Sequence, residues 1–464
     1  MMEVSAFQAL DRWDGYTVPP LHFPGRASRQ AIGSLLRRRI EPVNMRDHSF
    51  GSLQPITIHF NGLVSKRAVK KDRQYKMALF RARPSDLVLS KIDLKNGAVG
   101  VLPSDWDNAV VTSHFAIYEP DIERLHPIFL RYLVQTANFK RWLWANRSGA
   151  DGRTEVKLPI FEGLEIALPS IAEQQAAVTA HDAALTAAAA KEQAADVAET
   201  EAVASFEVAL GFAPAASLPD RPVFIASFQG LDRWSHDGAL RAAHGGGAGS
   251  TCWPVARLGD LIDDITVGWS PKCLDRPASV GGWGVLKLSA ITSGTLRSDE
   301  NKALLPSMPP RPDLAIREGD VLIARGSGVT RLVGSTALVD GVPSSNLMIC
   351  DLIFRVAFGH SSQLSPAFLV EVLRTPQLRY QIESRRTGAA PMMQKITKPG
   401  LRSLTFPLPP PAIQAALVAA LDAGRAIAAR LRAEAATART AARLAFEASV
   451  YDAALADVPG QVVA

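Results

Sequence analysis

The sequence has little cysteine and no long uncharged apolar run. Three cysteines occur among 464 residues, at Cys252, Cys273 and Cys350. They are too few and too scattered for a disulfide framework or a zinc site, which fits a reducing compartment. No uncharged apolar stretch approaches the length of about 18 residues that crosses a bilayer, and the start MMEVSAFQALDRW lacks the apolar centre of a signal peptide. We therefore expect a cytoplasmic protein with no membrane partner.

The sequence also lacks the common catalytic motifs. It contains no HExxH metal motif, no GxSxG nucleophile elbow and no NPPY-like tetrapeptide of an adenine methyltransferase. The stretch ARGSG at 324–328 lacks the ending of a phosphate-binding P-loop. A nuclease would place Asp121 and Glu155 on neighbouring strands, but a helical pattern from Pro127 to about Asn146 intervenes. We expect no catalytic residue, metal site or cofactor in this chain.

The composition is that of a globular protein with a small positive excess. Hydrophobic residues make up 47% of the chain and the formal net charge is +6. The length suggests roughly two to four domains with real cores. The positive charge favours an anionic partner, but it does not by itself identify nucleic acid.

Two stretches of the chain repeat. The heptapeptide FQALDRW at 7–13 returns as FQGLDRW at 228–234, and residues 168–210 align without a gap on 408–450. Such self-similarity predicts two copies of one unit, each running from LDRW through a variable region into a long segment. If the two long segments are antiparallel helices, the copies would close into a ring with pseudo-two-fold symmetry.

The long repeated segments are predicted to be continuous helices. They are rich in strong helix formers, follow Pro-rich starts, and would each extend roughly 60 Å. A spacing of four and three residues predicts a coiled-coil seam in the second copy and a similar stripe in the first. The seam residues are Ile413, Leu417, Ala420, Gly424, Ile427 and Leu431, and the stripe begins Ile171, Val178, Leu185. A close approach of two helices would explain a glycine at 424; the alternative is two unrelated Ala-rich surface helices.

The match continues upstream of each helix. In two strand–loop–strand segments, Asp86 falls on Asp320, Lys91 on Arg325 and Gly100 on Gly334, and further along Lys140 falls on Arg379 and Arg147 on Arg386. The predicted domains are a globular region at 1–168, a helix at 169–212, a second globular region at 213–408, and a helix with a tail at 409–464.

This order resembles the specificity subunits of type I restriction-modification enzymes. The resemblance is carried by the paired LDRW segments, by LPSIAEQQAAV and LPPPAIQAALV at the helix starts, and by DLVLSK and DVLIAR in the globular parts. The second helix start departs from the family pattern, because Ile413 replaces the glutamate before Gln414. The resemblance implies an α+β fold with two target recognition domains separated by two long antiparallel coiled-coil helices in a pseudo-two-fold circular repeat.

The resemblance also implies a non-catalytic function. Each variable region would read one half of a split motif in double-stranded DNA, and the coiled coil would set the gap between the halves. Two methyltransferase subunits would dock on the conserved parts, with S-adenosylmethionine held in those subunits, and motor-endonuclease subunits would join them. The alternatives are a coiled-coil adaptor or a specificity factor of another methylation-based defence system.

Basic residues are the candidate DNA contacts, because Lys and Arg neutralise phosphates. The candidates are Lys66, Arg67, Lys70, Lys71, Arg73, Lys76, Lys91, Lys140, Arg147 and Arg153 in the first copy, and Arg325, Arg331, Arg379, Arg385, Arg386 and Lys395 in the second. A solvated face, helix caps or internal ion pairs would account for the same charges. The candidates for partner binding are Asp11, Arg12, Trp13, Asp232, Arg233, Trp234, Gln174 and Gln414. The LDRW segments would alternatively staple each lobe to a helix end.

Overall fold

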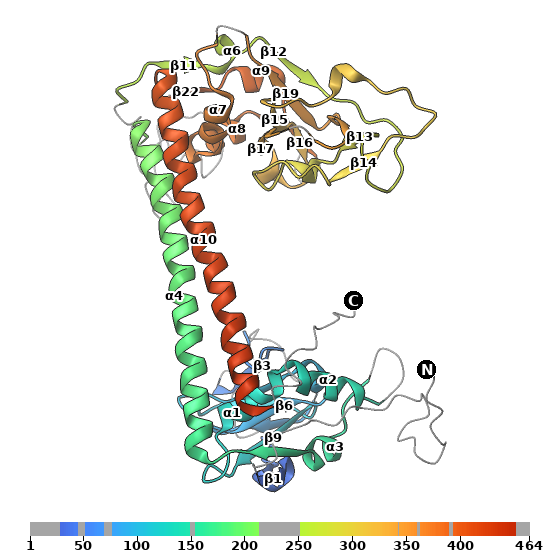
Figure 1. Ribbon diagram of the computed structural model, residues 1–464, viewed down its shortest axis with the longest axis vertical. Coiled ribbons are helices and arrows are strands. Elements are labelled where there is room, and N and C mark those ends of the chain that lie inside the picture. Colours follow the sequence, from blue (N-terminus) through green and yellow to red (C-terminus); the bar gives the residue numbers. More distant parts are fainter. Residues whose placement is uncertain are drawn as a thin grey trace. The chain divides into compact units, whose positions relative to one another are not determined.

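The computed structural model describes residues 28–44, 52–68, 77–148, 154–212, 251–341, 343–359, 362–388 and 393–451. The chain is mixed helix and sheet (Figure 1). It divides into two compact units: unit 1 comprises Met1–Glu192 and Arg432–Ala464, and unit 2 comprises Gln193–Leu431. The division cuts both long helices, α4 (Ile171–Ala209) and α10 (Pro411–Val450), so the units do not coincide with the four predicted segments.

Unit 1 contains lobe 1, the described residues of 28–168. One sheet has the order β2-β9-β6-β7 and the other the order β4-β3-β8-β5, while β1 pairs with β10. The strands are β1 (Ser28–Ala31), β2 (Leu36–Arg39), β3 (Gln54–Ile58), β4 (Val64–Lys66), β5 (Leu79–Arg81), β6 (Leu87–Ser90), β7 (Val99–Val101), β8 (Ala109–Thr112), β9 (Phe115–Pro120) and β10 (Glu165–Leu168); the helices are α1 (Pro127–Gln135), α2 (Ala137–Ala145) and α3 (Leu158–Gly163).

Unit 2 contains lobe 2, the described residues of 251–408. Its sheets have the orders β12-β19-β15-β17, β14-β13-β18 and β16-β21-β20, and β11 pairs with β22. The strands are β11 (Val255–Arg257), β12 (Asp264–Val267), β13 (Trp283–Leu286), β14 (Asn301–Ala303), β15 (Val321–Ala324), β16 (Gly326–Ser327), β17 (Thr336–Leu338), β18 (Asn346–Met348), β19 (Ile353–Ala357), β20 (Arg386–Thr387), β21 (Gln394–Ile396) and β22 (Thr405–Pro407); the helices are α6 (Leu258–Leu261), α7 (Pro366–Arg374), α8 (Pro376–Ser384) and α9 (Lys398–Arg402).

The two lobes share one topology, as the internal repeat predicts. The order β2-β9-β6-β7 corresponds to β12-β19-β15-β17. In the second sheet, β3 and β13 each pair with one antiparallel and one parallel neighbour. Both lobes then have two consecutive nine-residue helices and, before the long helix, a short helix and a strand; in lobe 2 the strands β20 and β21 come between α8 and α9.

One predicted correspondence inside the lobes is wrong. Leu89 of β6 pairs with Val99, whereas the matching Ile323 of β15 pairs with Thr336. Lobe 2 therefore has three more residues between these strands than lobe 1. The counterpart of Gly334 is Gly97, and both adopt a left-handed backbone with φ of 78° and 86°. Gly100 lies within β7, so the ungapped alignment was three residues out of register there.

Each lobe is completed by an aromatic residue from the last turns of the helix that follows the other lobe. In unit 1 the ring of Phe446 of α10 lies 5.6 Å from that of Phe129 of α1. In unit 2 the ring of Phe206 of α4 lies 6.0 Å from that of Phe368 of α7. Phe446 and Phe206 occupy equivalent positions of the repeat, as do Phe129 and Phe368. All four side chains are at most 5% exposed, so each contact belongs to a core.

The long helices bury a line of residues with a spacing of seven, and most of these residues are small. In each unit a segment of α4 lies beside a segment of α10 (Figure 1). In unit 1, Lys191 Nζ lies 2.7 Å from Glu434 Oε2 and Arg439 pairs with Glu192. The buried line comprises Gln174, Ala188 and Ala195 on α4 and Gln414, Leu421, Ala428, Ala435 and Ala442 on α10.

The predicted seam on α10 therefore has the observed repeat of seven residues, but half of its members lie on the exposed face of the helix. Ile413 and Ile427 are 38% and 45% exposed, and Ala420 is exposed as well. The remaining predicted members, Leu417, Gly424 and Leu431, are half-buried beside the buried line. In the first copy Ile171 is 37% exposed, Val178 is buried and Leu185 is half-buried.

Helix α10 is long and apolar enough, by length and composition alone, to cross a membrane, although it is not an uncharged run because it contains Asp422 and Arg425. Much of its apolar character comes from alanine. In unit 2 this helix carries Arg425, which ion-pairs with Glu371 of lobe 2. One such helix is weak support for a membrane span.

Gly424 allows close packing of the two helices in unit 2. A Cβ atom at this position would lie 2.4 Å from the Cβ of Ala202 on α4. That distance is far inside van der Waals contact, and the Cβ of alanine cannot swing aside. The close helix approach that would explain this glycine is thus present.

We predict that Gly424→Leu destabilises the protein by about 1–3 kcal/mol, because the added side chain forces α4 and α10 apart. Urea unfolding followed by circular dichroism measures the change. Ala423→Leu, at the exposed neighbouring position, is the matched control and should change the free energy of unfolding by less than about 0.5 kcal/mol. Equal effects of the two substitutions would contradict the close packing.

Candidate nucleic-acid interface

Gln174 and Gln414 attach the start of each long helix to the lobe that precedes it, through hydrogen bonds to the backbone. Both side chains are fully buried. The amide of Gln174 donates to the carbonyls of Arg124 and Pro169 at 2.9 and 2.8 Å and accepts from the backbone N–H of His126. The amide of Gln414 makes the same three bonds, donating to Gln363 O and Pro409 O and accepting from the Ser365 N–H. Their predicted partner-binding role is therefore wrong, because neither side chain is accessible to another molecule.

The basic residues shared by the two copies hold loops in place. Lys91 Nζ donates to the carbonyl of Ser113 at 2.7 Å, and Arg325 Nη1 donates to that of Asp351 at 3.2 Å. These carbonyls precede the equivalent strands β9 and β19. Because both cations are bonded to backbone at matching places, the shared charge at this position has a structural explanation.

A second shared pair lies against the left-handed glycines. The side chain of Lys140 packs on Gly97 and that of Arg379 on Gly334, so a Cβ at either glycine would clash with it. Arg379 Nη2 also donates to the carbonyl of Arg331 at 2.7 Å. Burial lowers the pKa of Lys140 and that of Arg379. Both cations therefore lose part of their hydration inside the lobe, and this loss disfavours their charged forms.

The third shared pair follows the second helix of each lobe. Arg147 Nη1 donates to the carbonyl of Trp144, three residues before it, and Arg386 Nε donates to that of Glu383 at 3.3 Å. Arg386 Nη1 also reaches the carbonyl of Thr330 at 3.0 Å. All of these cations except Arg147 belong to, or contact, the loop that joins β6 to β7, or β15 to β17.

In lobe 2 the structure brings most of the predicted DNA contacts together around this loop. Arg379 and Arg386 hold the carbonyls of residues 331 and 330, and Lys395 of β21 pairs with Gly326 of β16. Arg331 is exposed at the tip of the loop. Arg385 lies apart, with Nε bonded to Ser403 Oγ at 2.9 Å. The exposed cation Arg331 and the half-buried Lys395 are the remaining candidates for phosphate contact.

In lobe 1 the predicted contacts do not form one cluster among the described residues. Lys66 is exposed, with Nζ 4.9 Å from the ring centroid of Trp106, beside a cavity of about 300 Å³ that Gln54 and Asn108 also line. Arg67 is exposed next to it. The following predicted residues lie outside the described residues: Lys70, Lys71, Arg73, Lys76, Arg153, Asp11, Arg12, Trp13, Asp232, Arg233 and Trp234.

Two residues of lobe 1 that lie with Arg147 are not among the predicted DNA contacts. Lys95 is the middle residue of a 3-10 turn (Leu94–Asn96), as Arg331 is of the turn Thr330–Leu332. Its Nζ donates to Thr154 O and Oγ1 at 2.6 and 2.8 Å. Trp144 contacts both cations, since the charged groups of Lys95 and Arg147 are 5.8 and 4.8 Å from its ring centroid. The stretch KRWLWANR carries a signal, because its two tryptophans are flanked by cations on both sides.

The lobes are joined to their long helices by different chemistry. In lobe 1, Tyr132 of α1 donates to Asp182 of α4 and its ring lies 4.3 Å from that of His181. Burial raises the pKa of Tyr132 to about 12, so the phenol remains a donor at neutral pH. The corresponding residue of lobe 2 is Glu371 of α7.

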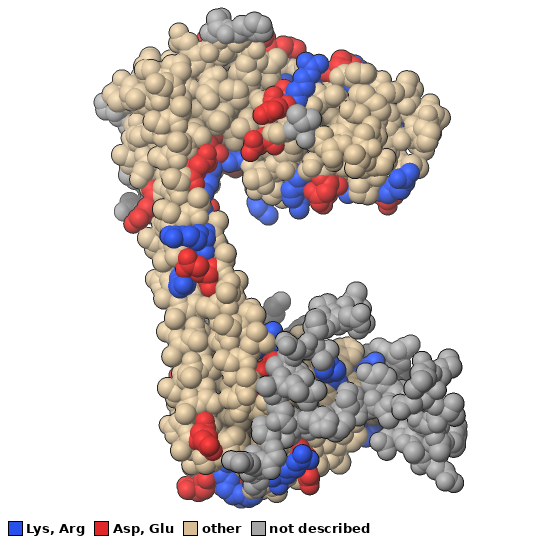
Figure 2. All heavy atoms as spheres, in the orientation of Figure 1, with Lys and Arg blue, Asp and Glu red and all other residues tan. Residues whose placement is uncertain are grey.

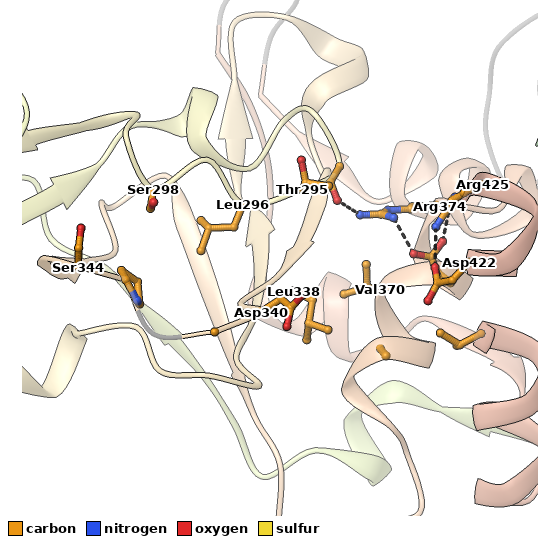
Figure 3. A pocket seen from close by; sticks show the side chains of 16 residues that line it. Thr295, Leu296, Ser298, Leu338, Asp340, Ser344, Val370, Arg374, Asp422 and Arg425 are labelled. Atoms are coloured by element: carbon orange, nitrogen blue, oxygen red, sulfur yellow. Dashed lines mark hydrogen bonds and ion pairs between the residues drawn. The ribbon is translucent and has the colours of Figure 1, made fainter. Parts of the chain in front are cut away.

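Glu371 forms a buried ion-pair network in unit 2. Its side chain is 8% exposed and lies 2.6 Å from Arg374 of α7 and 2.8 Å from Arg425 of α10. Figure 3 shows Arg374 and Arg425 converging beside a cavity of about 600 Å³, with Asp422 next to them. Arg374 also donates to the carbonyls of Gly294 and Thr336. One carboxylate thus connects two helices and, through Arg374, two further segments of the lobe.

No family model matches the sequence. The chain is similar to the type I restriction enzyme EcoEI specificity subunit of Escherichia coli, with 34% identity over 171 residues. The match covers 37% of this chain and 28% of the relative, so this chain spans less than a third of that protein's length. The resemblance that the paired motifs predict is confirmed by this relative.

The solved structures show the fold. One chain, from a structure described as the structural basis of complex assembly and conformational transition of the type I R-M system, matches 94% of this chain and 97% of its own length. The identity is 18% and the TM-score 0.56. The HsdS subunit from Thermoanaerobacter tengcongensis matches with 17% identity, coverage of 92% and 97%, and a TM-score of 0.47. The first match shows that the fold is shared along almost the whole chain.

We predict that Glu371→Gln destabilises the protein by about 3 kcal/mol, because it leaves two partly buried guanidinium groups without their carboxylate. Asp422→Asn is the control, since Asp422 is 63% exposed and lies 3.8 Å from Arg425; it should cost less than about 1 kcal/mol. Urea unfolding of the full chain measures both. A loss for Glu371→Gln as small as that of the control would argue against the network.

Proposed function

We propose that this chain is the DNA sequence-specificity subunit of a type I restriction-modification complex. The observation that carries the proposal is the pairing of two lobes of one topology with two equivalent long helices, each lobe being completed by the end of the other helix. A chain of this construction presents two recognition surfaces on one frame. Because the two surfaces differ in their side chains, the expected target is a split motif with two unlike halves.

The charge of each lobe supports double-stranded DNA as the target. Exposed Lys66 and Arg67 in lobe 1 and exposed Arg331 in lobe 2 are available for phosphates, and such contacts position a protein on DNA. Base readers are expected where the copies differ, because the shared cations are bonded within the lobes. The chain itself is proposed to be non-catalytic and to hold no cofactor.

The helices support the proposed partners. We infer that α4 and α10 form an antiparallel coiled coil that fixes the distance between the two recognition lobes. The visible face of these helices is mainly uncharged, with cations and anions in small mixed groups (Figure 2). Ile413, Ala420 and Ile427 form an exposed line on α10. We propose that two methyltransferase subunits, which would bind S-adenosylmethionine, dock along the helices, and that motor-endonuclease subunits join them in the cytoplasm.

We predict that deleting the gene, with its neighbours intact, removes base methylation at one split, asymmetric genomic motif. The reason is that the methyltransferase would lose the only subunit that reads its target. Modified-base mapping of genomic DNA from both strains measures this and yields the two half-sites. Unchanged methylation in a strain whose parent methylates a split motif would count against the proposal.

We predict that one heptad inserted into both helices, after Ala194 and after Glu434, lengthens the spacer of the methylated motif without changing either half-site. Seven residues add about 10 Å, which corresponds to about three base pairs at 3.4 Å each. A heptad preserves the buried line, whereas an insertion of four residues would rotate it and is the control. An unchanged spacer in the heptad variant would refute the proposal that the length of the helices sets the distance between the two half-sites.

A further inference from the structure

An exposed tryptophan on lobe 1 has two cations close to its ring. Trp144, in the last turn of α2, is 44% exposed. The guanidinium of Arg147 lies 4.8 Å and the ammonium of Lys95 5.8 Å from its ring centroid. A large aromatic ring left open to water beside two positive charges offers both an apolar surface and phosphate-binding groups.

The cations beside Trp144 are held by the backbone of lobe 1. Lys95 belongs to a 3-10 turn (Leu94–Asn96) and is bonded to Thr154, while Arg147 is bonded to the carbonyl of Trp144 itself. A β-bridge between Ser148 and Glu155 closes the chain next to them. The arrangement is thus built by three separate segments and does not depend on one mobile side chain.

Lobe 2 has the same frame without the tryptophan. Arg386 corresponds to Arg147, and both donate to the carbonyl three residues earlier. At that earlier position lobe 2 has Glu383 in place of Trp144. A carboxylate there would repel a phosphate backbone, so the two lobes differ in chemistry at one identical place of the fold.

We propose that Trp144, with Lys95 and Arg147, is a DNA-contact site peculiar to lobe 1, in which the indole ring packs on a sugar or base edge and the cations meet the flanking phosphates. The inference rests on the proposed function and adds the residues that distinguish one half-site from the other. The ring contributes a contact that does not depend on salt, and Arg147 contributes one that does.

The test uses the assembled methyltransferase complex and a duplex that carries the split motif mapped by methylation. Trp144→Ala should raise the Kd about tenfold and leave the slope of log K against log salt unchanged. Arg147→Gln keeps a donor for the carbonyl of Trp144 but loses the charge, and it should lower the magnitude of that slope by about one. Glu383→Ala, the matched change in lobe 2, should not weaken binding.

Three outcomes would overturn the inference. The first is a Kd for Trp144→Ala within about twofold of the wild-type Kd. The second is a salt slope for Trp144→Ala that falls in magnitude as much as the slope for Arg147→Gln does. The third is loss of the methyltransferase from the complex, which would make Trp144 a protein-docking residue. If the wild-type complex does not prefer the mapped duplex over a scrambled one, the proposed function itself fails, and this result is distinct from the other three.

Discussion

The rest of the structure depends on one kind of contact: the core of each lobe includes residues from the end of the long helix that follows the other lobe. Phe446 packs on Phe129 in unit 1, and Phe206 packs on Phe368 in unit 2. Burying an aromatic side chain of this size stabilises a core by several kcal/mol, so the ends of both helices are fixed on lobes that they do not follow in sequence. The buried glutamines fix the starts of the same helices. Specific side chains therefore anchor both ends of each long helix to a folded lobe.

The lobes show how one frame can carry two different surfaces. Positions that hold the frame together keep their chemistry in both copies, as Gln174 and Gln414 do with identical hydrogen bonds. Positions on the outside change freely, as from Trp144 to Glu383. The joints between lobe and helix also differ, with a tyrosine–aspartate bond in one and a buried ion pair in the other. The repeat therefore preserves geometry more strictly than it preserves the interactions that produce it.

The sequence predicted the architecture well because its signals are long and repeated. The helices observed at 171–209 and 411–450 lie within the predicted 169–212 and 409–464. The helix face was harder to predict, since alanine is apolar on every side of these helices and the period alone does not choose a face. The buried line of each helix includes a glutamine, Gln174 or Gln414. A search for apolar residues alone leaves this polar residue out, and so it does not identify the buried face.

The candidate site was predicted less well for a related reason. A cation bonded to a backbone carbonyl and a cation that awaits a phosphate look the same in a sequence. Lys91 and Lys140 are predicted contacts because the second copy also has a positive charge there, yet this sharing reflects the common scaffold. Lys95 and Trp144 were missed because their proximity depends on a 3-10 turn and a helix end meeting in space. Differences between the copies are the better guide to recognition.

These cores, built from distant segments, have a consequence for synthesis of the protein on the ribosome. Lobe 1 is encoded first, but its core includes Phe446, Val450 and Tyr451. Roughly 300 residues must be translated after Phe129 before Phe446 exists, which takes about 15 to 60 s at ordinary elongation rates. During that interval the core residues of lobe 1 that pack on Phe446 have no native partner, while Phe206, which packs on lobe 2, is made before the residues of lobe 2. We therefore expect chaperones to bind the nascent chain mainly at its first lobe and to protect that lobe until the chain is complete.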